Sequence, residues 1–295
     1  MTGFLQLLFQ GLALGATYAL IALGFTLIYR ATEVVNFAQG AMLLVGAYVT
    51  SWLAVDHGVP FGLAAAVAMV ALAVAGGLFQ IGVLRRVRGR SVFARVMITI
   101  GLAVVLTAAV SALWGPNARV LGDPWGSSAI DVGGVVINWV RIWAIVCTAA
   151  VLLAYFVFDR RSRYGLALRA TAADPEAALA AGVPVRRIHA MTWAIAGAVA
   201  SLGGVFLAGF PQSPNPLLGD SALRVFPAII LGGLESPVGA VIGGVVIAVV
   251  EVLTSGYAPA WLGENFYTVA PYIVMIGVLL VRPYGLFGVR PAERP

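Results

Sequence analysis

The sequence predicts an all-α, polytopic membrane protein, and three observations support this fold class. The 295 residues are 61% hydrophobic and only 10% charged, whereas a soluble domain carries about 25% charged residues. Several long intervals of the chain contain no charged residue at all. These apolar runs are continuous rather than alternating, which favours helices over the strands of a membrane barrel. Lipid is therefore expected to solvate much of the folded surface.

The intervals without charge locate the spans, because about 20 apolar residues in a helix cross the hydrocarbon core. They predict eight full transmembrane helices, at about 4–29, 38–54, 61–84, 96–114, 140–158, 190–210, 237–255 and 266–281. A ninth apolar stretch, Val225–Gly233, is too short to span alone. Gly232, Gly233 and Pro237 lie beside Glu235, a pattern typical of a helix that is broken or re-enters within the protein.

The placement of arginine predicts the orientation. All eighteen basic residues are Arg, and fifteen of them belong to one face of the expected bundle: Arg30, the segments 85–95 and 159–189, and the tail from Arg282. The positive-inside rule assigns that face to the cytoplasm. The N-terminus is then outside and the C-terminus inside. This requires an odd number of crossings, so the stretch 225–233 must reach the cytoplasmic side.

We expect one transmembrane domain over residues 1–295, with its informative cytoplasmic loop at 159–189. In that loop Asp174 suits a helix N-cap, Pro175 the first helical position and Glu176 the first turn, while Gly182 supplies a stop. Together they predict a two-turn helix at 175–182. Two interpretations stand: a surface helix that only orders the loop, or a docking element for a cytoplasmic partner.

The residue types exclude several functions. A Walker A loop needs a Lys, and the chain has none, so it lacks that nucleotide-binding motif. His57 and His189 have no Cys or carboxylate set around them, and the acids are isolated, so we expect neither a metal site nor an enzyme. The net charge of +6 follows membrane topology rather than nucleic-acid binding. A membrane enzyme acting on lipid and an ion-coupled secondary transporter remain the competing classes.

A candidate substrate path begins at the second span. Asn36 could cap that helix, so that its N-terminal amides face a pore and receive a carboxylate, with Phe37 and Gln39 beside it. Thr17 and Tyr18 interrupt the first apolar run and could face the same cavity. The alternatives are that Asn36 and Gln39 only cap a helix at the membrane surface, and that Tyr18 packs between helices.

Two acids and a pattern of small residues complete the candidates. An unpaired acid at mid-bilayer costs about 2.5 kcal/mol or more, so Glu251 needs a partner, either in a proton relay or in an interhelical hydrogen bond near the outer surface. Glu235 has the same ambiguity. Small residues recur at spacings that allow helices to approach closely, within the chain or at a dimer face: Gly11, Gly15, Ala19, Ala196, Ala200, Gly204, Ala208, Gly239 and Gly243.

Several motifs resemble a known family. Glu176-Ala177-Ala178, followed after three residues by Gly182, resembles the Glu-Ala-Ala loop of bacterial ABC importer permeases. Four further segments resemble the branched-chain amino-acid permeases, of which urea and short-amide permeases are close relatives: Leu14–Tyr29, Val35–Gly40, Tyr164–Ala170 and Gly232–Ala240. The resemblance runs over about 3–288. The chain departs from the family at Gln39, where His is common, and at Glu235, where Gly is common.

The resemblance implies the architecture of an ABC importer permease in the bacterial inner membrane. It implies a second related permease, two cytoplasmic ATPases that bind ATP and Mg, and an extracytoplasmic binding protein that delivers the substrate. The substrate class it implies is branched-chain or similar aliphatic amino acids, with urea or short amides as the alternative. The predicted helix with Asp174, Pro175, Glu176, Ala177, Ala178 and Gly182 would dock on an ATPase.

Overall fold

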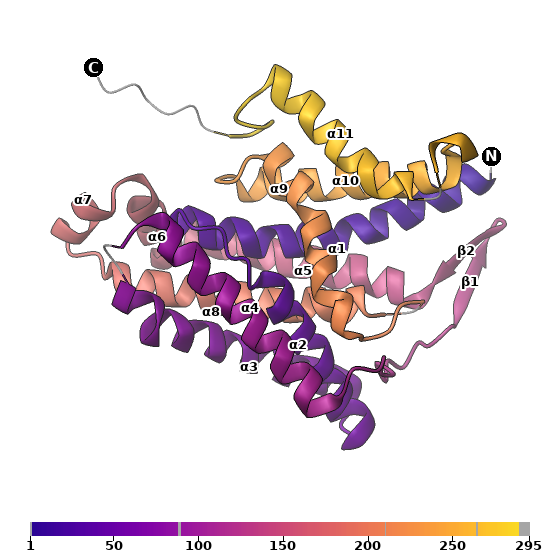
Figure 1. Cartoon of the computed structure of the whole chain (residues 1–295), viewed down its shortest axis with the longest axis horizontal. Helices are drawn as coiled ribbons and strands as arrows, with labels where there is room; N and C mark the ends of the chain where they lie inside the picture. The colour runs from indigo at the N-terminus through magenta and orange to yellow at the C-terminus, as the bar shows by residue number, and fades with distance from the viewer. Residues whose placement is uncertain (1, 88–89, 210, 264, 289–295) are drawn as a thin grey trace.

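Figure 1 shows the computed structural model of the chain, which describes residues 2–87, 90–209, 211–263 and 265–288. Its α-helices are α1 (Thr2–Thr32), α2 (Gln39–Ser51), α3 (Phe61–Gly82), α4 (Val92–Trp114), α5 (Trp139–Arg161), α6 (Arg163–Ala173), α7 (Pro175–Ala180), α8 (Val185–Leu207), α9 (Phe226–Gly232), α10 (Pro237–Tyr257) and α11 (Phe266–Val281). Each of the eight predicted spans overlaps one of these helices over most of its length. The predicted class, a polytopic membrane protein built of helices, is confirmed.

The lengths differ from the expectation. Six helices in the described ranges are long and apolar enough to cross a membrane, so the count of eight full spans is not confirmed. Helix α2 has 13 residues and α11 has 16, which at about 1.5 Å per residue is less than the hydrocarbon thickness. A π-helical segment, Trp52–Asp56, extends α2 by five residues.

The predicted break before the tenth helix is confirmed. The short apolar stretch forms α9, a helix of seven residues, and Gly233 ends it with a φ of 99°, a conformation that glycine adopts readily. Ser236 then caps α10, because its Oγ accepts a hydrogen bond of 3.0 Å from the Gly239 amide, and Pro237 takes the first turn. Glu235 lies exposed in the connection between the two helices.

The segment 115–139 contains a β-hairpin that the all-α expectation missed. Strand β1 (Ala129–Val132) pairs antiparallel with β2 (Val135–Asn138), with Ala129 opposite Asn138. Gly133 and Gly134 connect them with positive φ angles of 63° and 84°, as a two-residue turn requires to match the twist of the strands. Each strand has only four residues, so its alternating pattern in the sequence is too short to be recognised beside the long apolar runs.

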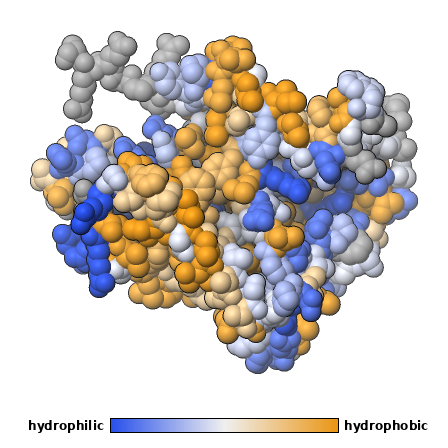
Figure 2. Space-filling view, viewed as in Figure 1, coloured by the Kyte–Doolittle hydropathy of each residue, from blue (hydrophilic) through white to orange (hydrophobic). Residues whose placement is uncertain are grey.

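Helix α1 occupies the centre of the bundle. Its most apolar window is 83% buried, against 61% for α8 and 11% for α4, and α1 packs against α10, α8 and α5. Helix α4 and the outer faces of α3 and α5 thus present apolar side chains outward. Figure 2 shows hydrophobic side chains over much of one face, with hydrophilic ones gathered mainly toward its two ends.

Glycines set the spacing of the central helices. A Cβ at Gly15 would lie 2.8 Å from the Val245 Cα, and one at Gly244 only 2.6 Å from the Ala19 amide nitrogen, so α1 and α10 approach with backbone against backbone. A Cβ at Gly204 would overlap the Leu43 carbonyl oxygen of α2. The expectation that these small residues pack within the chain is confirmed.

The bundle has two ends, which differ in the elements that lie there. The N-terminus and the β-hairpin lie at one end, which we call the hairpin end (Figure 1, right). Helices α6 and α7 lie at the other (Figure 1, left), as do the α3–α4 connection and the end of α1, and we call it the arginine-rich end. Arg88, Arg290 and Arg294, which the sequence also assigned there, lie outside the described residues.

Gly204→Ala should lower the melting temperature of the purified protein, because the added Cβ must push α8 away from α2. Gly101→Ala is the matched control: Gly101 also lies within a helix, and a Cβ added there would meet nothing within 4 Å. It should leave the melting temperature unchanged or raise it. Equal losses in the two variants would contradict the assigned α2–α8 contact.

Candidate functional site

A cavity of about 450 Å³ opens at the hairpin end of the bundle. Helices α1, α5, α8, α10 and α11 form its walls together with a 3-10 helix, η3 (Pro216–Val225). We call it the hairpin-end cavity. Its polar lining includes Gln10, Thr17, Tyr18, Arg141, Gln212, Asn215, Ser221, Arg224, Glu251 and Tyr267.

A charged network crosses this cavity. The Tyr18 hydroxyl donates a hydrogen bond of 2.7 Å to Glu251 Oε2, and Arg224 Nη1 lies 3.5 Å from Glu251 Oε1. Glu251 is 6% exposed and Arg224 is 47% exposed, so the guanidinium reaches from the open side to a carboxylate held inside. Such pairing is what an acid within the membrane needs. An interhelical hydrogen bond, one of the two interpretations of Glu251, is therefore present between α1 and α10.

Local sequence explains how these groups meet. The glycine contact between α1 and α10 brings the α1 backbone close enough for Tyr18 to reach Glu251. Asn215 begins η3 by accepting the Leu217 amide, and Pro216 occupies its first turn. Arg224 then falls in the last turn of η3. Arg141, in the first turn of α5, adds a second cation to the lining.

The cavity contains two of the six predicted path residues, Thr17 and Tyr18. The Thr17 hydroxyl donates back to the Ala13 carbonyl of its own helix, at 3.4 Å. Arg224 was missed by the sequence interpretation. A signal for it existed, since a buried acid such as Glu251 requires a cation at its own level, and Arg224 is one of the few arginines at the hairpin end.

Asn36, Phe37 and Gln39 lie elsewhere, and Asn36 does not cap α2 as predicted. The N-cap is Ala38, without a side-chain hydrogen bond. Asn36 instead accepts the Ala38 amide at 3.0 Å and donates to Gln39 Oε1 at 3.2 Å, while Gln39 donates to the Ala196 carbonyl of α8 at 3.4 Å. Both carboxamides are fully buried, so this pair joins helices rather than facing the hairpin-end cavity.

Phe37 and Glu235 also have contacts away from this cavity. The Phe37 ring stacks on Phe226 with centroids 5.7 Å apart, and its amide donates to Thr99 Oγ1 at 3.2 Å. Glu235 borders a separate cavity of about 180 Å³ with Tyr29. Tyr29 lies near the arginine-rich end of α1, so Glu235 does not line the hairpin-end cavity with Tyr18, and its place on a substrate path stays a prediction.

The segment 159–189 is more helical than the loop that the sequence predicted. Helix α5 continues to Arg161, α6 follows at once and α8 begins at Val185. Ser162 makes the sharp junction possible, since its Oγ accepts the Gly165 amide at 3.0 Å. A Cβ at Gly165 would overlap the Asp159 carbonyl, so only glycine allows this approach. The capping role of Ser162 was the signal for the missed helix.

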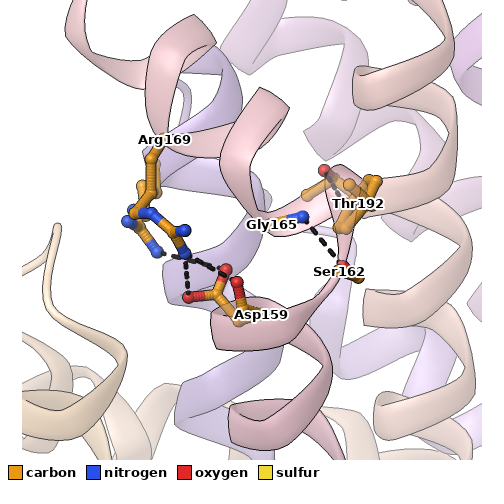
Figure 3. A network of polar contacts seen from close by, with 7 residues as sticks. Asp159, Ser162, Gly165, Arg169 and Thr192 are labelled. Atoms are coloured by element: carbon orange, nitrogen blue, oxygen red, sulfur yellow. Dashed lines mark hydrogen bonds and ion pairs between the residues drawn. The ribbon is translucent and has the colours of Figure 1, made fainter.

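Asp159 is the centre of the polar network in Figure 3. Arg169 Nη1 donates to its carboxylate at 3.1 Å and to its carbonyl at 2.6 Å, and Arg30 of α1 lies 3.9 Å from the same carboxylate. Tyr164 and Thr192 share a hydrogen bond of 2.6 Å. Burial raises the pKa of the Tyr164 hydroxyl to about 12, which keeps it protonated. The network thus fastens α6 to α1, α5 and α8.

The predicted helix after this network is present as α7. Asp174 caps it by accepting the amides of Glu176 and Ala177 at 2.9 and 3.0 Å, and Pro175 is in its first turn. It ends at Ala180 rather than at 182, and Gly182 follows with a φ of 81°. Ala178 is buried, whereas Leu179 is 63% exposed. Helix α7 therefore presents an apolar side chain outward at the arginine-rich end.

No metal centre emerges from the part of the chain that the structure describes, where no three His, Cys, Asp or Glu residues are grouped to hold an ion. The hairpin-end cavity offers two cations and one carboxylate inside an otherwise apolar bundle.

Comparisons with known proteins assign the chain's relatives. A family described as the branched-chain amino acid transport system permease component matches residues 7–280. The chain is 33% identical to the high-affinity branched-chain amino acid transport system permease protein LivH of Salmonella typhimurium, over 99% of this chain and 97% of that protein. It is 30% identical to the corresponding BraD protein of Pseudomonas aeruginosa, over 99% and 98%.

One solved structure is similar at lower identity. It is PsaBC from Streptococcus pneumoniae in complex with Fab, with a TM-score of 0.46 and 14% identity over 94% of this chain and 90% of that chain.

A double-mutant cycle should show that Tyr18 and Glu251 act together. Tyr18→Phe should lower the free energy of unfolding by about 1.5–3 kcal/mol, because it removes a buried hydrogen bond to a charged group. In a Glu251→Leu background the same change should cost close to nothing. The cycle is measured by thermal unfolding in detergent. An equal cost in both backgrounds would show that the two groups are independent.

Proposed function

The chain belongs to the family of branched-chain amino acid transport system permease components, and we propose that it forms the translocation path for branched-chain or similar aliphatic amino acids in an ABC importer. ATP hydrolysis on separate cytoplasmic subunits drives the movement. A second, related permease completes the pore, and an extracytoplasmic binding protein delivers the substrate. The chain contributes the transmembrane part and no catalytic residue.

The hairpin-end cavity carries this proposal. An amino acid is a zwitterion, so it needs a cation for its carboxylate and an acid for its ammonium group. Arg224 and Arg141 supply the first and Glu251 the second, within one cavity of about 450 Å³. The apolar neighbours Leu14, Val140 and Phe206 suit an aliphatic side chain. Urea and short amides carry no separated charges and would gain only hydrogen bonds from these groups, which favours the amino acid over that alternative.

The arginine asymmetry supports an orientation with the hairpin end outside. The positive-inside rule assigns the arginine-rich end to the cytoplasm, which leaves the N-terminus and the hairpin-end cavity facing the binding protein. Helices α2 and α11, though short, then bring the crossings of a single domain, 1–295, to eight. Helix α9 supports this topology. It leads from η3 toward Glu235, which lies beside Tyr29 near the arginine-rich end, and so stands for the ninth crossing; α10 then returns to the hairpin end.

Helix α7 is the proposed contact with the ATPase. It lies at the arginine-rich end, Asp174 and Pro175 fix its start, and Leu179 projects outward beside Glu176. Gly182 allows the turn into α8, and the Asp159 network ties the segment to α1. The chain has no Lys for a Walker A loop, so ATP and Mg are bound by the partner subunits.

Vesicles that contain the chain with its partner permease, ATPases and binding protein should take up leucine only when ATP is present, and should not take up urea. Glu251→Gln should lower that uptake about tenfold or more, because the ammonium group loses its counter-charge. Glu235→Gln is the control, since Glu235 is exposed and lies outside this cavity. ATP-independent uptake by the chain alone would instead support an ion-coupled transporter.

Leu179→Asp should uncouple the ATPase from transport, because it places a charge on the apolar side chain that α7 presents. We expect about tenfold lower ATP-driven uptake with normal membrane insertion. Leu166→Asp on α6 is matched in exposure, 65% against 63%, and should have the smaller effect. If Leu179→Asp transports normally, α7 is only a surface helix that orders the segment.

A further inference from the structure

A second cavity, of about 310 Å³, lies at the arginine-rich end between α1, α3, α4 and α8. Four arginines line it, one pair from the α3–α4 region and one pair from the start of α8: Arg85, Arg95, Arg186 and Arg187. We call it the arginine cavity. No residue of α7 and no residue of the hairpin-end cavity lines it, so the transport proposal does not use this cavity.

The arginines of this cavity have no acidic partner among the residues that the structure describes. Arg95 donates to the Thr32 carbonyl at 3.0 Å, and no ion pair joins any of the four arginines to an acid of the described chain. No acidic side chain is among the described residues that line it, although Glu33 follows Thr32 in the sequence and is exposed. These four cations, three of them exposed, are thus available to an anion that enters the cavity.

The wall of the arginine cavity that lies further from the arginines is mostly apolar, but it includes two polar side chains, Gln80 and Trp193. Trp193 and Leu84 are buried there, and Gln80 is 8% exposed. Gln80 Oε1 and Trp193 Nε1 are buried without a hydrogen-bond partner in the described chain. Both atoms are enclosed by protein, and rotation of the Gln80 carboxamide toward the arginines would let a hydroxyl group of an occupant bond it.

The depth of the cavity fits a lipid. Trp193 is six residues beyond Arg187 on α8, which places it about 9 Å further into the bundle than the arginine rim. The neighbouring helices α3 and α4 are only 22% and 11% buried over their apolar windows, so the cavity adjoins the surface that lipid covers. Ile81 extends from the lining as a half-exposed apolar side chain of α3.

We propose that the arginine cavity binds the headgroup of an anionic phospholipid with a polyol, such as phosphatidylglycerol. Its phosphate is bound by Arg85, Arg95, Arg186 and Arg187, and its glycerol hydroxyls lie toward Gln80. The acyl chains run along α3. Basic pockets between transmembrane helices on the cytoplasmic side recognise anionic lipids in this way.

The test is lipid retention by the purified permease in neutral detergent, measured by native mass spectrometry with added phosphatidylglycerol or phosphatidylcholine. The unaltered protein should retain phosphatidylglycerol preferentially. Arg85→Gln/Arg187→Gln should weaken its binding by about 30-fold, from two lost headgroup charges. The control Arg160→Gln/Arg161→Gln removes two exposed arginines at the same end that do not line the cavity, and should retain the lipid.

Three outcomes would overturn the proposal. Equal loss in both double variants would mean that the lipid responds only to the net charge of this end. Thermal stabilisation by inorganic phosphate equal to that by phosphatidylglycerol would mean that a free anion, not a lipid, occupies the cavity. If Arg85→Gln/Arg187→Gln fails to fold, Ala190→Phe fills the cavity while keeping every charge. Undiminished phosphatidylglycerol binding in that variant would also reject the site.

Discussion

The close approach of α1 and α10 is the contact on which the two ends of this protein depend. Inside a bilayer the lipid tails are as apolar as leucine, so helices associate through tight packing of small residues rather than through the hydrophobic effect. Gly15 faces the Val245 Cα, and Gly244 faces the Ala19 amide. That spacing lets Tyr18 reach Glu251 across the two helices. A larger side chain at either glycine would separate the helices and leave a carboxylate in the membrane without its partner.

Helix α1 also joins the proposed substrate cavity to the proposed coupling segment. Tyr18 belongs to the hairpin-end network, and Arg30, twelve residues later, lies beside Asp159 at the junction of α5 and α6. The helix is continuous over Thr2–Thr32, so these two points are about 18 Å apart on one rigid element. A displacement of α6 and α7 by an ATPase would therefore move α1 directly. This gives a physical route between ATP hydrolysis outside the chain and the cavity within it.

Much of the fold could be predicted from the sequence, because apolar length and glycine spacing are local properties. The charge-free intervals located the helices, and Asp174, Pro175 and Gly182 located α7. Pairings between distant residues were less accessible. Asn36 has the chemistry of an N-cap, yet it bonds Gln39 because Gly24 and Ala196 leave room for that carboxamide between α1 and α8. The need of Glu251 for a partner was predictable, but its identity depended on where η3 positions Arg224. Helix α6 was missed because its arginines resemble an ordinary cytoplasmic loop.

The central claim is that the hairpin-end cavity faces outside and receives the amino acid. Ser221 lines that cavity and is partly exposed, so a Ser221→Cys protein in a Cys147→Ala background provides a direct probe. In the assembled transporter, a membrane-impermeant thiol reagent added from outside should modify this cysteine, and leucine should slow the modification whereas urea should not. Modification only from the inside, or a rate that leucine leaves unchanged, would contradict the claim.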